Sequence, residues 1–174
     1  MKKLFTELEL QNAHWVKINN WKQNYELRTV DGGVIATMTR PSVWRSRAEV
    51  EAAGNRWVFE RKGFFRQQIE IQSAGAGEYP AVFHYRMDRG RLEYHDGRQF
   101  LWQKSGILSN RFVWSTTDGE PIVGYQVSGL LNIRGTVSLD PARSEQEVPS
   151  LLLFLGWYLI TLHQDDTAAI VAAT

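Results

Sequence analysis

Apolar and polar residues alternate along much of the chain before residue 140. In residues 65–71 the apolar side chains share one face with Gln67, and the remaining polar and charged side chains lie on the other face. Residues 81–87 and 131–139 alternate in the same way. Such alternation is typical of strands with one buried and one solvated face, so the pattern predicts β-strands over residues 4–139.

Turn signals separate these segments. Asp-Gly dipeptides lie between alternating segments at residues 31–32, 96–97 and 118–119. Asp-Gly is typical of tight hairpin turns, because glycine adopts positive φ without a Cβ clash. Further turns are predicted at residues 62–63 and 88–90, and further strands at residues 4–10 and 14–18. The predicted total is about twelve strands, mostly antiparallel.

One stretch, residues 148–162, does not alternate. From Leu151 to Leu162 only Gly156 and Thr161 are not strongly apolar, so a helix here is apolar around its whole circumference and needs to be enclosed. At about 1.5 Å per residue it is roughly 18 Å long, well short of the roughly 30 Å of hydrocarbon that a membrane span crosses. We therefore expect protein to enclose it and predict no transmembrane span. The predicted helix covers about residues 149–163, and the sequence leaves open whether it continues beyond His163.

The predicted strands and helix fit together as one domain over residues 1–174. Eight-stranded barrels are filled by their own side chains, whereas a barrel of about eleven strands has room for a helix. The sequence therefore predicts an all-β fold, a closed barrel of about twelve strands that encloses an apolar C-terminal α-helix. A short surface helix is also predicted over residues 47–53, because Ser46 and Glu49 have capping-box spacing and Gly54 suits a C-terminal stop.

Composition narrows the class of function. Twenty basic and nineteen acidic residues leave a formal charge of +1, without the strong positive charge of most nucleic-acid binders, so we do not expect nucleic acid as a partner. The chain has no cysteine, which excludes disulfides and thiolate metal sites. Glu7 and Glu9 interrupt the apolar run that a signal peptide needs, so we expect a cytoplasmic protein.

The pattern of Asp31-Gly32, Asp96-Gly97 and Asp118-Gly119 hairpins, followed by the apolar residues 150–162, resembles the tubby C-terminal-like group. This group includes the tubby domains, the phospholipid scramblases and the LURP-one-related proteins. The resemblance spans nearly the whole chain and implies a helix threaded through the barrel and binding at membrane surfaces, with phosphoinositide recognition in the tubby branch. No site residue transfers, since no basic cluster matches the tubby phosphoinositide pocket and the acylated cysteine cluster associated with scramblases is absent.

The sharpest local feature is RPSVWRSR at residues 40–47. Arg40, Arg45 and Arg47 around Trp44 could place cations on lipid phosphates while the indole lies at the interface, which makes these four residues the predicted lipid-binding site. The alternative is a solvated loop with Trp44 folded back onto the barrel. Typical polybasic lipid sites carry 4 to 8 basic residues, more than this segment.

One further group of residues has the side chains that metal binding or acid-base catalysis would need. Glu93 and His95 share a strand face, with His84 on the partner strand, which could form part of a metal or general-base site. Asp96 is simply explained as a turn residue, and no nucleophile-elbow, phosphate-loop or zinc-protease motif occurs. We predict no metal, no cofactor and no catalysis, and expect most of the seven tryptophans to fill the core.

Three hypotheses for function follow. The first is a non-catalytic module that attaches peripherally to anionic phospholipid membranes, and the second is a protein-protein adaptor or scaffold without lipid binding. The third is a lipocalin-like carrier of a hydrophobic ligand, which requires the apolar C-terminal segment to pack outside the barrel.

Overall fold

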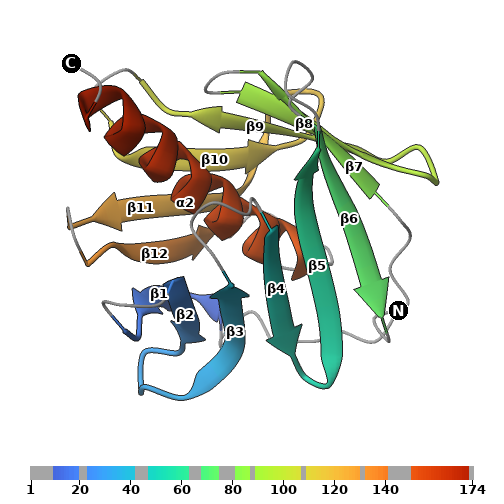
Figure 1. The fold of residues 1–174 in the computed structure, drawn as a ribbon. Coiled ribbons are helices and arrows are strands. Elements are labelled where there is room, and N and C mark those ends of the chain that lie inside the picture. The colour runs from blue at the N-terminus through green and yellow to red at the C-terminus, as the bar shows by residue number, and fades with distance from the viewer. Residues whose placement is uncertain are drawn as a thin grey trace.

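A computed structural model describes residues 10–19, 23–41, 47–62, 68–74, 81–86, 89–106, 109–129, 132–140 and 150–172. In this part of the chain, twelve antiparallel strands form one closed barrel (Figure 1). Each strand pairs with its neighbour in sequence, and pairing of β1 with β12 closes the barrel. The predicted fold class is confirmed.

The strands and the helix have the following bounds. They are β1 His14–Lys17, β2 Gln23–Arg28, β3 Val34–Arg40, β4 Arg47–Ala52, β5 Asn55–Lys62, β6 Gln68–Ala74, β7 Ala81–Arg86, β8 Arg89–Tyr94, β9 Gln99–Lys104, β10 Arg111–Ser115, β11 Pro121–Ser128, β12 Arg134–Leu139 and α2 Ser150–Ala172. Of the strand predicted over residues 4–10, only Leu10 lies within the described residues, and it is helical.

The prediction of a short helix over residues 47–53 is wrong. This segment is β4, in which every second side chain is buried and Val50 pairs with Trp57 of β5. Ala53 and Gly54 have φ values of 48° and 76° and join β4 to β5 as a tight turn. Gly54 therefore marks a hairpin and not the end of a helix, and the pairing with β5 outweighs the local capping signal.

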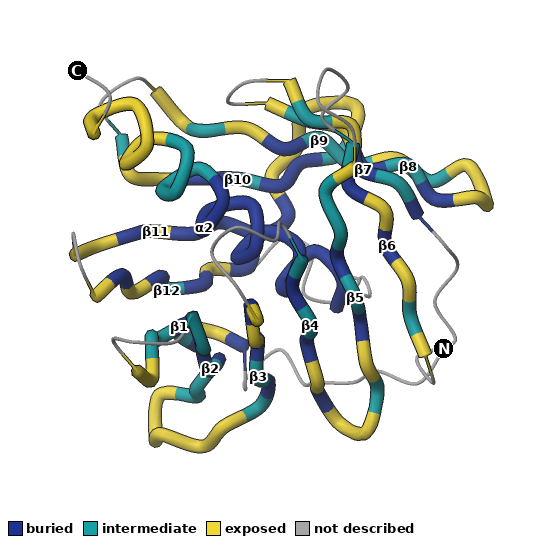
Figure 2. Tube along the Cα trace, in the orientation of Figure 1, coloured by how far each residue is buried: buried dark blue, intermediate teal, exposed yellow. Residues whose placement is uncertain are grey.

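The helix α2 occupies the interior of the barrel. All residues from Ser150 to Leu162 are buried, whereas the helix is exposed from Thr167 to Ala172 (Figure 2). The predicted start is confirmed, and the helix continues well past His163. In the described part of the chain, no helix combines the length and the apolar character that crossing a membrane requires.

Aromatic side chains fill the space between α2 and the barrel wall. Trp57 and Phe154 have ring centroids 4.8 Å apart, Phe59 and Tyr158 5.5 Å, and Trp15 and Trp157 5.8 Å. Five tryptophans are buried, which confirms the predicted core role for Trp15, Trp57, Trp102, Trp114 and Trp157. Trp21 and Trp44 lie outside the described residues.

The helix also contacts β11 and β12 at close range. The Tyr125 hydroxyl of β11 donates to the carbonyl oxygens of Leu152 and Leu153, at 2.8 and 3.0 Å. A Cβ at Gly156 would lie 2.6 Å from the Tyr125 hydroxyl oxygen, and a Cβ at Gly135 would overlap the indole of Trp157. Glycine at both positions lets α2 approach these strands.

Candidate functional site

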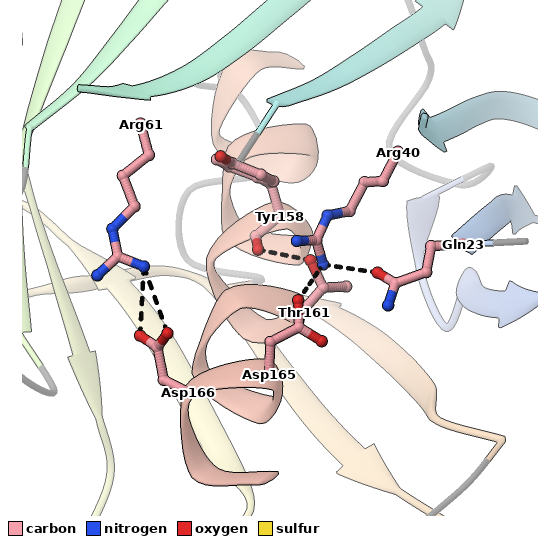
Figure 3. A network of polar contacts seen from close by, with 7 residues as sticks. All are labelled: Gln23, Arg40, Arg61, Tyr158, Thr161, Asp165 and Asp166. Carbon is pink, nitrogen blue, oxygen red and sulfur yellow. Dashed lines mark hydrogen bonds and ion pairs between the residues drawn. The ribbon is translucent and has the colours of Figure 1, made fainter. Parts of the chain in front are cut away.

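The outer end of α2 leaves the barrel beside two arginines of the wall. Asp165 lies 2.7 Å from Arg40, at the end of β3, and Asp166 lies 3.3 Å from Arg61, near the end of β5 (Figure 3). Because neighbouring strands are antiparallel, the ends of β3 and β5 meet the starts of the even-numbered strands at one end of the barrel.

We call the twelve strand-terminal residues at this end the exit rim. They are Lys17, Gln23, Arg40, Arg47, Lys62, Gln68, Arg86, Arg89, Lys104, Arg111, Ser128 and Arg134. Nine of these described residues are lysine or arginine, and none is acidic. At the opposite rim, the corresponding described strand ends contain one basic residue, Arg28, together with His14. The barrel is therefore electrostatically polarised along its axis.

Most of the exit-rim cations are accessible. Lys62, Arg86, Arg89, Arg111 and Arg134 are exposed. Six of the nine have no ion-pair partner among the described residues. These six are Lys17, Arg86, Arg89, Lys104, Arg111 and Arg134. The exit rim thus presents positive charge that the described part of the chain does not neutralise.

Two of these cations lie opposite each other across a hairpin. Arg86 of β7 pairs in register with Arg89 of β8, so both side chains project from the same face. Like charges directly opposite each other in an antiparallel pair are destabilising. An anion bound between them would relieve that repulsion.

Apolar side chains also lie at this end. Ile170 and Val171 of α2 are 67% and 70% exposed, and Ile18, which follows Lys17, is 50% exposed. Among the described residues, the other exposed large apolar side chains, Val30 and Val34, flank the β2–β3 turn at the opposite rim. A helix end that is apolar as well as exposed therefore lies at the exit rim, beside the ends of β9, β10 and β11 (Figure 1).

Arg40 has a structural position. Its side chain is 1% exposed, and its guanidinium donates to the Gln23 side chain at 2.7 Å and pairs with Asp165 (Figure 3). The guanidinium carbon lies 5.9 Å from the centroid of the Tyr158 ring. Arg40 thus ties β3 to α2, and its charge is compensated inside the barrel.

Burial dominates the acid-base properties of the phenols near this contact. Burial, reinforced by the Asp165 carboxylate and opposed by Arg40, raises the pKa of Tyr25 to about 12. Burial also raises the pKa of Tyr158, against the opposing effect of Arg40 and Arg61. Both phenols are therefore neutral at physiological pH.

Of the four predicted lipid-binding residues, the two that the structure describes lie on neighbouring strand ends of the exit rim and differ in environment. Arg40 is buried, Arg47 is partly exposed and pairs with Glu49 at 3.0 Å, and Trp44 and Arg45 lie outside the described residues. The unpaired cations Arg86, Arg89 and Arg134 belong to strands that are distant in sequence from residues 40–47. In the sequence these cations are visible only as a basic residue at nearly every second strand boundary. The closed antiparallel order brings those boundaries together at one end of the barrel.

Among the described residues, His84, Glu93 and His95 do not gather into a group that could hold a metal ion. His84 and Glu93 are 3.6 Å apart, and Glu93 also pairs with Arg91 at 2.9 Å. His95 lies in the exposed turn after β8. Glu93 is thus held as an ion-pair partner on the outer surface.

Hollows on the surface of the described part of the chain include one at each end of the barrel. One, of about 540 Å³, lies beside the outer turns of α2 at the exit rim. The other, of about 450 Å³, lies between the start of β3 and the β4–β5 turn at the opposite end.

Comparison of the chain with protein-family models, curated proteins and solved structures finds no match. The geometry of the exit rim is therefore the basis for assigning a function.

Proposed function

We propose that this protein is a non-catalytic module that attaches to anionic phospholipid membranes through its exit rim. The observation that carries the proposal is the combination of unpaired cations at strand ends with an exposed apolar helix end at the same end of the barrel. Each Lys or Arg near an anionic leaflet contributes about 1 kcal/mol of attraction. Apolar side chains that enter the headgroup region leave water, and this burial adds to the free energy of membrane binding.

The two features together favour a lipid surface over other anions. A basic rim alone would also suit nucleic acid, but exposed Ile170 and Val171 gain little from a phosphate backbone in water. At a bilayer the cations meet phosphates while these side chains leave water. The resemblance to the tubby C-terminal-like group supports the same proposal.

The alternatives fit the geometry less well. A lipocalin-like carrier needs an open interior, whereas residues 151–162 of α2 fill the barrel. An adaptor could use any exposed surface, but it does not explain why the exposed cations gather at the end where α2 emerges. Membrane attachment explains both the charge and its position.

Vesicle binding tests the proposal. The protein is sedimented with phosphatidylcholine vesicles that contain or lack phosphatidylserine, at low and high salt. We expect binding only to the anionic vesicles, weakened by salt because the screening length falls from about 10 Å at 0.1 M to about 3 Å at 1 M. Equal binding to neutral vesicles, or none to either, would refute the proposal.

A further inference from the structure

The hollow of about 540 Å³ at the exit rim is an elongated groove between α2 and the barrel wall. Its helix side is formed by one face of α2, spaced three or four residues apart: Ile160, His163, Gln164, Thr167, Ala168, Val171 and Ala172. At 1.5 Å per residue this face is roughly 18 Å long. Phe112 and Val127 form the opposite, apolar wall.

The charged lining of the groove is cationic. Lys104, at the end of β9, is one of the unpaired exit-rim cations and also lines the groove. No Asp or Glu occurs among the described residues that form the walls. A ligand that fits both features has a long, narrow apolar part and an anionic end.

We propose that the groove binds one acyl chain of an anionic phospholipid, with the headgroup beside Lys104. The volume lies within the roughly 300–1,000 Å³ of small-molecule sites, and the length along α2 suits an extended chain better than a compact ligand. The groove is continuous with the surface of Ile170, Val171 and the exit rim that we assign to the membrane. The inference rests on the proposed function for its source of lipid, since the bilayer supplies the chain.

Short-chain lysophosphatidylserines, used below the concentration at which they form micelles, test the groove without a bilayer. Titration calorimetry on the full chain should show binding that tightens about fourfold for each added methylene until the groove is full. Glycerophosphoserine, which has the headgroup and no chain, should not bind measurably. Affinity independent of chain length would overturn the inference.

Two adjacent alanines provide a matched pair of variants. Ala168 lines the groove and Ala169 does not, and both are exposed on the last turns of α2. Ala168→Phe should fill the groove and weaken lysophosphatidylserine binding by at least about tenfold, whereas Ala169→Phe should leave it unchanged. Equal affinities of the two variants would contradict the assignment.

The outcomes separate the groove from the membrane proposal. If the protein binds phosphatidylserine vesicles but no lysophosphatidylserine of any chain length, the groove assignment is wrong and membrane attachment stands. If it binds the lysolipid in a chain-length-dependent way but no vesicle, the groove assignment stands and membrane attachment is wrong. Absence of both kinds of binding refutes both.

Discussion

At the scale of single residues, two glycines set how closely α2 approaches the barrel wall. Gly135 of β12 lies against Trp157, and Gly156 of α2 lies against Tyr125. Neither glycine has positive φ, so a larger residue is excluded by the lack of space for a Cβ and not by the backbone conformation. The sequence alone does not distinguish these two glycines from others, because the side chain that each of them accommodates is distant in sequence.

Gly135→Ala should destabilise the protein by about 1–3 kcal/mol, the usual cost of overpacking a core. The new Cβ would overlap the Trp157 indole, which is fully buried and has little room to move. Urea unfolding followed by tryptophan fluorescence measures the effect. Gly124→Ala is the matched control, because its Cβ would meet the rotatable hydroxyl of Ser138, 2.7 Å away. Equal losses in both variants would contradict this account of the helix-wall contact.

Buried phenols make the fold sensitive to alkali. Burial raises the pKa of Tyr25 to about 12, while a phenol in the unfolded chain has a pKa near 10. Below pH of about 10 the phenol is protonated in both states. Between about 10 and 12 the unfolded state loses its proton while the folded state keeps it, so the free energy of unfolding falls as pH rises.

The measurement is urea unfolding at a series of pH values, compared between the parent protein and Tyr25→Phe. We expect the stability of the parent to fall between pH of about 10 and 12 and the fall to be smaller in the variant. An identical pH dependence in the two proteins would show that Tyr25 ionises normally in the folded state.

At the scale of elements, the predictable features were those with a local period. Alternation predicted the strands, and the all-round apolar residues 151–162 predicted a helix enclosed by them. The sequence predicts a helix at β4 because the capping-box spacing is local, whereas the pairing of β4 with β5 is a tertiary contact. The sequence does not define the end of α2, because polar residues 163–166 fit either a helix stop or a polar belt within the helix. The partners of Asp165 and Asp166 lie on β3 and β5, which are distant in sequence.

These two aspartates should differ sharply in their contribution to stability. Asp165→Asn leaves the 1% exposed Arg40 side chain without its carboxylate, and breaking a buried pair costs roughly 3 kcal/mol or more. Asp166→Asn removes the partner of Arg61 at a more exposed site, where pairs contribute about 0–1 kcal/mol. The same substitution at adjacent helix positions serves as its own control in urea unfolding. A larger loss for Asp166→Asn would refute the structural role of the Arg40 pair.

At the scale of the whole molecule, the barrel has two unlike ends. The exit rim collects cations from strands throughout the chain, and the opposite rim contains the Asp-Gly turns at Asp31, Asp96 and Asp118. This polarity could not be predicted from the sequence, because the net charge is only +1 and no segment contributes more than a few basic residues to the rim. It follows from the closed antiparallel order, which brings every second strand boundary to the same end.

The most direct test of the central claim removes equal charge from the two ends. Arg86→Gln with Arg89→Gln neutralises two cations of the exit rim, and Arg28→Gln with Arg56→Gln neutralises two near the opposite rim. Both double variants have the same net charge, so binding to phosphatidylserine vesicles compares two unpaired cations of the exit rim with two ion-paired cations near the opposite rim. We predict that the exit-rim variant binds about thirtyfold more weakly, at about 1 kcal/mol per charge, while the opposite-rim variant binds like the parent protein. Equal binding by the two variants, or a greater loss from the opposite rim, would contradict the account.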